Sequence, residues 1–175
     1  MVQRLLEALG IGRDAPPKEK GTLFARLHER LADVGEARLE YLTAFAGLLA
    51  RAAFGDSDVS PAEEQAMMEC LRDRAGLDEA DAELVAEIAR RATETLYGVE
   101  DYLLTRSFNE HAADVDKEIL LDCLYTVVAA DGTIPAAEDD EIKRIGKALL
   151  VPHAKILQIR SSYRDRLAIL RDLPS

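Results

Sequence analysis

Two segments of the chain are apolar around nearly the whole circumference of a helix, and this restricts the folds open to it. Residues 36–54 and 117–130 carry aliphatic and aromatic side chains on far more than one face of a 3.6-residue period. A helix of this kind is stable in water only when other helices surround it. We therefore expect two central buried helices, each enclosed by amphipathic neighbours.

The rest of the chain also favours helices over strands. Apolar residues recur every three or four positions in six further segments: 22–34, 61–75, 78–96, 99–116, 135–150 and 152–170. No segment alternates apolar and polar residues as a half-buried strand does. The sequence therefore predicts an all-α fold, a bundle of about seven to eight helices packed around the two central ones.

The domain organisation is read from helix-breaking residues near the start of the chain. Residues 1–9 predict a short helix that stops at Gly10, and the stretch up to Gly21 contains Pro16, Pro17 and several charged residues. We expect residues 1–21 to form a short N-terminal helix and linker, and residues 22–175 to form one helical domain, a size typical of single domains.

The charge balance excludes several classes of partner. Asp and Glu number 33 against 22 Lys and Arg, which gives a net charge of −11. Such a chain repels nucleic-acid phosphates and anionic lipid, so we expect neither nucleic-acid binding nor direct membrane insertion. No run of about eighteen apolar residues is present, and residues 1–9 are too short and too charged for a secretory signal. A cytoplasmic location is expected.

The chain contains two cysteines, Cys70 and Cys123, each at helical spacing among apolar residues. We interpret both as small core residues. Without a secretory signal, two cysteines do not predict a disulfide.

An internal repeat links the two acidic loops. A spacing of 75 residues separates Asp56 from Asp131 and Glu63 from Glu138, and apolar positions before and after them match at the same spacing. Each copy predicts a buried helix, a tight acidic loop and an amphipathic helix. Two copies favour a closed bundle with pseudo-two-fold symmetry over an extended solenoid.

The acidic loops have a purely structural interpretation. Ser60, Pro61 and Glu63 have the spacing of a capping box, with serine before the helix and proline at its first position. Gly132 supplies the positive φ of a turn, and Glu138 lies in a first helical turn, where the helix dipole favours carboxylates. Capping alone accounts for these features without a ligand.

The alternative interpretation is a cation site, because the loops hold more carboxylates than capping requires. Oxygen ligands of this kind suit Ca²⁺ or Mg²⁺. The candidate metal ligands are Asp56, Asp58, Glu63, Asp131 and Glu138. The spacing is not that of an EF-hand, because its twelfth position, a bidentate glutamate, is Met67 in one copy and Ile142 in the other. We expect an affinity no better than about 10⁻⁴ M unless the two loops converge.

No pattern in the chain indicates catalysis. The three histidines, His28, His111 and His153, fall on different predicted helices and form no Cys/His ligand pattern. The chain has no glycine-rich phosphate loop and no Gly-x-Ser-x-Gly nucleophile motif. We therefore predict no catalytic residues and a protein that is not an enzyme; a metal-dependent enzyme would need a concave pocket with convergent carboxylates.

The second acidic loop carries a family resemblance. Residues 127–138, Val-Val-Ala-Ala-Asp-Gly-Thr-Ile-Pro-Ala-Ala-Glu, resemble the helix–Asp-Gly–x–aliphatic–x–x–x–Glu signature of the TerB family of tellurite-resistance proteins. Residues 53–63 are similar, with Ser57 in place of the glycine. The resemblance extends over residues 23–170.

The resemblance implies both a fold and a function. It implies a helical bundle wrapped around two central helices, and divalent-cation binding through Asp56 and Glu63 in one copy and Asp131 and Glu138 in the other. The same domain type occurs in membrane-anchored DnaJ-like co-chaperones, which implies a module with a protein partner in a stress or tellurite-resistance context. A plain scaffold whose acidic loops only cap helices is the competing hypothesis.

Overall fold

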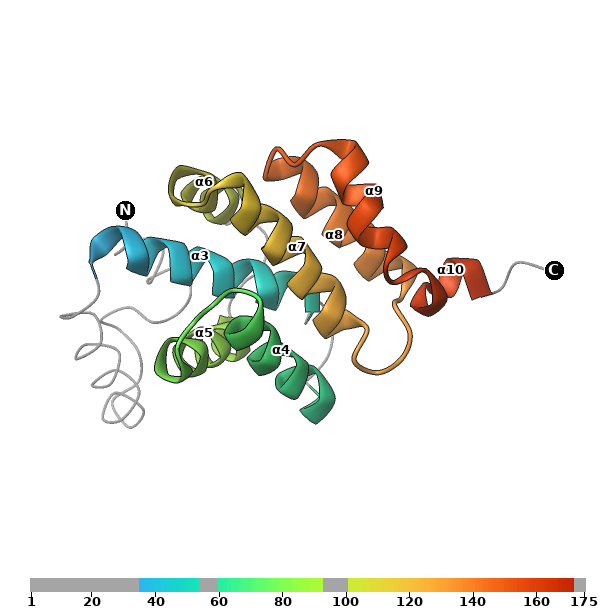
Figure 1. Ribbon diagram of the computed structural model, residues 1–175, viewed down its shortest axis with the longest axis horizontal. Helices are drawn as coiled ribbons and strands as arrows, with labels where there is room; N and C mark the ends of the chain where they lie inside the picture. The colour runs from blue at the N-terminus through green and yellow to red at the C-terminus, as the bar shows by residue number, and fades with distance from the viewer. Residues whose placement is uncertain (1–34, 54–59, 93–100, 172–175) are drawn as a thin grey trace.

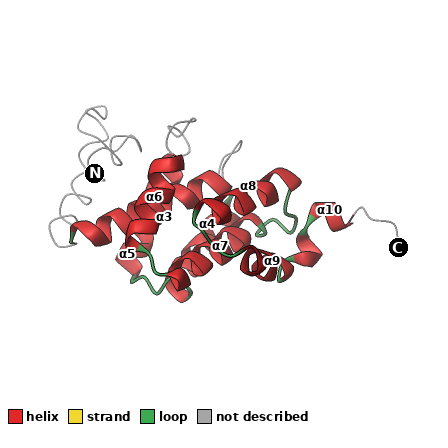
Figure 2. Cartoon of the chain, turned by 90° about the horizontal axis from the view of Figure 1, so that it is seen from above, coloured by secondary structure: helices red, strands yellow, loops and turns green. Residues whose placement is uncertain are grey.

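Helices make up the regular structure of the computed structural model, which describes residues 35–53, 60–92 and 101–171. In chain order they are α3 (Glu36–Ala53), α4 (Pro61–Asp73), α5 (Glu79–Ala92), α6 (Asp101–His111), α7 (Asp114–Val128), α8 (Ala136–Ala148), α9 (His153–Ser161), a 3₁₀ turn (Arg164–Arg166) and α10 (Ala168–Arg171). Figure 2 shows these helices in red, joined by short loops. The predicted all-α fold is confirmed. The predicted N-terminal helix, linker and helix 22–34 lie outside the described residues.

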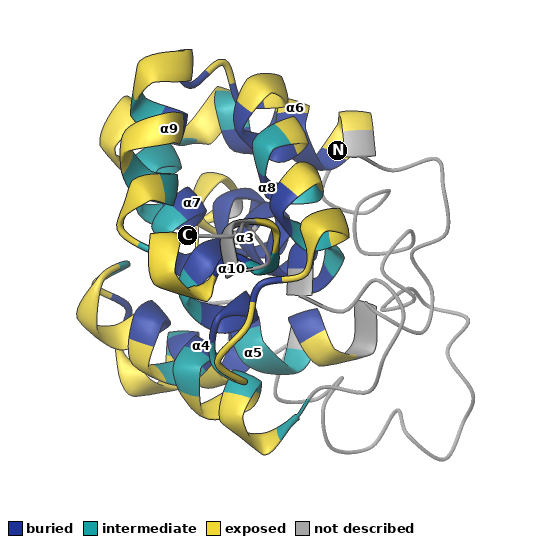
Figure 3. Cartoon of the chain, turned by 90° about the vertical axis from the view of Figure 1, so that its right-hand side faces the viewer, coloured by how far each residue is buried: buried dark blue, intermediate teal, exposed yellow. Residues whose placement is uncertain are grey.

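The two central helices are α3 and α7. Helix α3 contacts α5, α6, α7 and α8, whereas α7 also contacts α4, α8 and α9. Figure 1 shows α4 and α5 on one side of this pair and α6, α8 and α9 on the other. The two helices are mostly buried (Figure 3). The prediction of two buried helices is confirmed, and their boundaries lie within three residues of the predicted 36–54 and 117–130.

Helix α6 packs closely on α3 because of a glycine. A Cβ atom at Gly47 would lie 2.6 Å from Cδ2 of Leu104, so a side chain at position 47 would force the Leu104 side chain to move. The rings of Tyr41, Phe45 and Phe108 fill the same interface, with centroids 5.3–5.9 Å apart. The absence of a side chain at position 47 thus leaves room for Leu104 of α6 against α3.

One predicted helix, residues 99–116, is in fact interrupted. Helix α6 ends at His111 and α7 begins at Asp114. The carboxylate of Asp116 accepts a hydrogen bond from the backbone N–H of Ala113 at 2.8 Å, and this contact starts a new helix. Apolar periodicity continues across the break, so the pattern alone does not reveal it.

The predicted C-terminal helix, residues 152–170, is also divided. Helix α9 ends at Ser161, and the chain then crosses back to the loop between α7 and α8. There Ile134 and Leu167 form a parallel bridge: the N–H of Ile134 donates to the Arg166 carbonyl at 2.7 Å, and the N–H of Ala168 donates to the Ile134 carbonyl at 3.0 Å. These backbone hydrogen bonds replace those of a continuous helix.

A disulfide between Cys70 on α4 and Cys123 on α7 corrects the sequence interpretation. The two Cα atoms are 5.6 Å apart, and both residues are buried. The predicted burial is confirmed, but the expectation of two unlinked core cysteines is wrong. Helical spacing places each cysteine on a buried face; it does not tell which buried faces meet.

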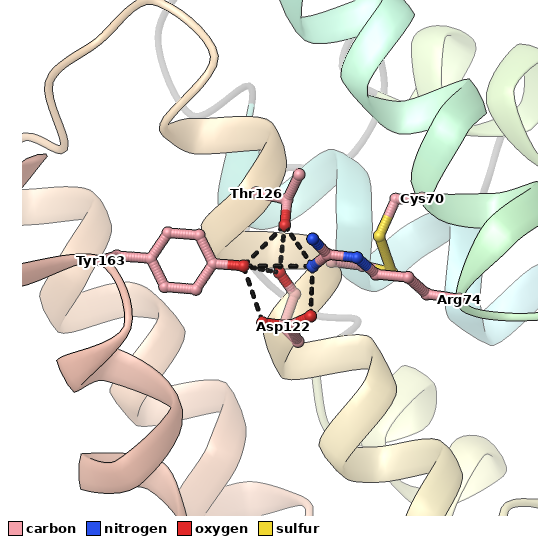
Figure 4. Close-up of a disulfide and its surroundings, with 6 residues drawn as sticks. Cys70, Arg74, Asp122, Thr126 and Tyr163 are labelled. Carbon is pink, nitrogen blue, oxygen red and sulfur yellow. Dashed lines mark hydrogen bonds and ion pairs between the residues drawn. A yellow bond between two sulfur atoms is a disulfide. The ribbon is translucent and has the colours of Figure 1, made fainter.

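A polar cluster lies beside the disulfide and joins α4, α7 and the segment after α9 (Figure 4). Arg74, directly after α4, donates to the carboxylate of Asp122, to Oγ1 of Thr126 at 2.6 Å and to the hydroxyl of Tyr163 at 3.2 Å. The Tyr163 hydroxyl in turn donates to Asp122 at 2.7 Å. Arg74 and Cys70 are one helical turn apart, so the C-terminal end of α4 is held to α7 at two adjacent points.

A buried carboxylate connects α8 to α7 and α9. Asp139 accepts hydrogen bonds from the Tyr125 hydroxyl at 2.9 Å and from the Arg160 guanidinium at 2.8–3.0 Å, and Lys143 lies 3.2 Å away. Burial alone would raise the pKa of Asp139, but these hydrogen bonds outweigh burial and lower its pKa. The stability that this carboxylate contributes is therefore present above about pH 4 and is lost as the pH falls further.

We predict that Asp139→Ala lowers the free energy of unfolding by about 3 kcal/mol, because Arg160 loses its carboxylate partner in a largely buried site. Urea denaturation at pH 7 measures this loss. The control is Asp140→Ala, at the next position, where the carboxylate is 76% exposed and pairs with Lys143. It should change stability by less than about 1 kcal/mol. Equal losses in the two variants would contradict a special role for Asp139.

Candidate functional site

The first part of the site is the beginning of α4. The Ser60 hydroxyl accepts a hydrogen bond from the Glu63 N–H at 3.2 Å, and Oε2 of Glu63 accepts one from the Ser60 N–H at 2.8 Å. Pro61 occupies the first helical position, where its missing N–H costs nothing. The predicted capping box is confirmed. Glu63 is therefore held in a fixed position at the helix end.

The second part is the loop that follows α7. Gly132 has a φ of +90°, which is the positive value expected for the predicted turn, and its N–H donates a hydrogen bond to the Ala129 carbonyl at 2.9 Å. Beyond it, the bridge to Leu167 fixes the buried residue Ile134. The exposed residue Asp131 lies inside the turn that the hydrogen bond from Gly132 closes, three residues before Ile134.

The two loops meet through one hydroxyl group. Oγ of Ser60 donates a hydrogen bond to Oδ1 of Asp131 at 3.2 Å while it accepts the bond from Glu63. Figure 1 shows the first turn of α4 and the α7–α8 loop at the same end of the bundle. We refer to Ser60, Glu63, Asp131 and Glu138 together as the acidic junction. It brings together two distant segments of the chain, because Ser60 and Asp131 are 71 positions apart.

Glu138 differs from Glu63 although both hold the third position of a helix. The residue before α8 is Pro135, which has no N–H group. The carboxylate of Glu138 therefore has no N-cap amide from which it could accept a hydrogen bond. Among the described residues, no hydrogen bond or ion pair engages its half-buried carboxylate. Burial, together with the negative charges of Glu63 and Asp131, raises the pKa of Glu138 from 4.5 to about 7.

The neighbouring acidic residues of α8 are neutralised, in contrast to Glu138. Asp139, Asp140 and Glu141 each lie beside at least one cationic side chain. The partners are Arg160 and Lys143 for Asp139, Lys143 for Asp140, and Arg51 and Arg144 for Glu141. The negative charge that stays unbalanced in this part of the described chain is therefore concentrated at the acidic junction.

The structure brings together three of the five predicted ligands. Glu63, Asp131 and Glu138 converge, whereas Asp56 and Asp58 lie outside the described residues. Within residues 35–53, 60–92 and 101–171, no group of three or more His, Cys, Asp or Glu side chains is arranged to hold a metal ion. The predicted ligand set therefore stays a prediction.

Sequence reasoning missed two features of the acidic junction. The hydrogen bond between Ser60 and Asp131 joins residues 71 positions apart, and nothing in the local sequence indicates it. The lack of a hydrogen-bond partner for Glu138, by contrast, can be recognised in the sequence, because Pro135 stands where the first copy has Ser60. A comparison of the two copies at that position would have identified it.

The fold and the acidic junction define a class of all-α domain. In it, each of the two enclosed central helices is followed by an acidic segment, and the two segments meet. The family model described as "Tellurite resistance protein TerB" matches residues 42–161, and the chain belongs to this family. The resemblance noted in the sequence is confirmed. No curated protein and no solved structure matches the chain. Among the described helices, none combines the length and the hydrophobicity that crossing a bilayer requires.

We predict that Glu138→Gln stabilises the metal-free protein at neutral and alkaline pH, because it removes a carboxylate whose ionised form is disfavoured. The folded-state pKa of about 7 lies above the ordinary 4.5. Glu138 therefore favours the folded state below pH 4.5, and that contribution is lost as the pH rises toward 7. The advantage of the variant should grow over this interval and then level off, at about 1 kcal/mol because the group is only partly buried.

Urea denaturation in the presence of a chelator, repeated between pH 4.5 and pH 8, measures this difference. The matched control is Glu64→Gln, which removes the same charge from an exposed position in the first turn of α4. Its effect should be small and nearly independent of pH. If the difference in stability between Glu138→Gln and the native chain is the same at every pH, the junction does not perturb the pKa of Glu138.

Proposed function

We propose that this TerB-family domain is a non-enzymatic cytoplasmic module that associates with a protein partner in a stress or tellurite-resistance context. We further propose that it binds a divalent cation weakly at the acidic junction. The observation that supports cation binding is Glu138, a half-buried carboxylate without a described partner that faces two other carboxylates. Neither capping nor an ion pair explains its position.

A cation would relieve the repulsion between these carboxylates. Ca²⁺ and Mg²⁺ are hard ions that prefer carboxylate, carbonyl and water oxygens, which matches Glu63, Asp131 and Glu138. Because no three of the described His, Cys, Asp or Glu side chains are arranged to hold an ion directly, the bound ion would keep much of its water shell, as Mg²⁺ commonly does. We therefore expect a dissociation constant of about 10⁻⁴ to 10⁻³ M.

The interaction role is supported by apolar side chains that face water. Leu150 is 77% exposed and has a φ of +61°, a left-handed conformation that residues other than glycine rarely adopt. Tyr102 and Val115 are 68% and 61% exposed. A protein partner would cover such surface. An ion at the junction would connect α4 to α8 at the end of α7 opposite to Val115, so we propose cation binding and partner binding for different ends of this helix.

The competing function is a scaffold in which the acidic loops only cap helices. The double hydrogen bond between Ser60 and Glu63 favours it, because that pair is satisfied without any ion. The two hypotheses differ at Glu138, where a scaffold offers only the favourable effect of the helix dipole on a first-turn carboxylate. They also differ in their response to cations, because a scaffold should unfold at the same temperature with or without Ca²⁺.

We predict that Ca²⁺ or Mg²⁺ at millimolar concentration shifts the backbone NMR signals of residues 60–64 and 131–138. Binding requires an ionised carboxylate, so a pKa near 7 at Glu138 makes the apparent affinity about tenfold weaker at pH 6 than at pH 8. Titrations at the two pH values measure both effects. An unchanged spectrum at 10 mM metal, about ten times the weakest expected constant, would contradict cation binding.

Paired variants locate the effect. Glu138→Gln should abolish the metal-induced shifts and Glu64→Gln should retain them, because only the first removes a carboxylate from the junction. If both variants retain the shifts, the ion binds elsewhere on the acidic surface.

A further inference from the structure

Helices α4 and α7 run antiparallel and are joined at both ends of their contact. At one end Ser60, before α4, meets Asp131, after α7. Toward the other end Cys70 of α4 is bonded to Cys123 of α7, and Arg74 binds Asp122. Residues later in α4 therefore pair with residues earlier in α7, which is the pattern of antiparallel helices. The acidic junction and the disulfide are therefore two contacts of one helix pair.

The disulfide determines the register of this pair. Cys70 lies ten residues after Ser60, which corresponds to about 15 Å along a helix. Both cysteines of the chain take part in the bond, so it is the one disulfide that the sequence permits. A covalent bond between two helices prevents one from sliding or rotating past the other, and such a shift would separate Ser60 from Asp131.

The position of α4 in the bundle makes it dependent on this bond. Helix α4 contacts α7 and α5, whereas the central helices contact three or more neighbours. Its buried side chains are Met67, Cys70 and Leu71, near the disulfide, and its first turn is largely exposed. A peripheral helix with a largely exposed first turn can open locally at lower free energy than the central helices.

We infer that thiol–disulfide exchange at Cys70 and Cys123 controls the acidic junction: the oxidised protein holds Ser60 and Glu63 against Asp131 and Glu138, and the reduced protein releases them. As a regulation of cation affinity, this inference rests on the proposed function. It also suits a cytoplasmic protein, because disulfides in that compartment are uncommon and are mostly transient or redox-sensing.

The reaction needs an oxidant, for which a small-molecule disulfide such as oxidised glutathione is sufficient. The thiolate of one cysteine attacks the small disulfide, forms a mixed disulfide and expels one small thiolate. The second cysteine thiolate then attacks the protein sulfur of the mixed disulfide and expels the other. Two protein thiols are oxidised by two electrons, the small disulfide is reduced to two thiols, and the two protons pass to the expelled thiolates.

Burial adds a condition to this exchange. The two cysteines are 3% and 0% exposed, so a small thiol reaches them only when α4 opens locally. Opening of α4 also separates the acidic junction. An ion that connects α4 to the α7–α8 segment would oppose this opening, so we expect Ca²⁺ to slow reduction of the disulfide.

The experiment compares the full chain with the disulfide intact and after anaerobic reduction by a phosphine. Two quantities are measured in each state: the dissociation constant for Ca²⁺ by NMR titration at pH 8, and hydrogen–deuterium exchange of peptides covering residues 60–73. We expect Ca²⁺ affinity to fall about fivefold or more on reduction, a typical size for coupling between two sites. Exchange at residues 60–66 should become faster, while peptides from α3 stay unchanged.

A double variant supplies the control. Cys70→Ser with Cys123→Ser should behave like the reduced protein and should not respond to the phosphine; if it fails to fold, the reduced native chain provides the same comparison. Equal Ca²⁺ affinity and equal exchange in both redox states would overturn the inference and leave the proposed function intact. If neither state binds Ca²⁺ but exchange still differs, the proposed function fails and disulfide control of the junction is supported.

Discussion

Burial of α3 and α7 is the interaction on which the other features of this domain depend. A helix that is apolar on most sides exposes too much hydrophobic surface to exist alone, and its enclosure is the main gain in folding. Amphipathic helices meet this need by turning one face inward. The enclosure of α7 then fixes where the chain emerges at Ala129, and hence where Asp131 lies relative to the start of α4.

The sequence predicted the features of the fold that depend on residues close together in the chain. The 3.6-residue period identified the helices, and the spacing of Ser60 and Glu63 identified the capping box, because both depend on neighbours within one or two turns. The disulfide and the Ile134–Leu167 bridge are contacts across more than thirty residues. Periodicity places a residue on a buried face without naming its partner. The same limit hid the contact between Ser60 and Asp131.

The candidate site could be predicted in part for the same reason. Matching positions in the two copies selected Glu63, Asp131 and Glu138, and the structure brings them together. Their different electrostatic states arise from one change, because Pro135 cannot offer the amide that Ser60 offers to Glu63. Similar sequence patterns therefore give one carboxylate that completes a helix end and one that stays uncompensated. Asp56 and Asp58, outside the described residues, stay predictions.

The bridge between Ile134 and Leu167 bears on how much chain the domain needs. The TerB family model ends its match at residue 161, six residues before Leu167. A fragment cut at that boundary would keep α3 to α9 but lose the backbone pairing that fixes the α7–α8 loop, and with it the anchor of Asp131. The shortest fragment that retains a native acidic junction therefore extends beyond the family boundary and includes Ala168.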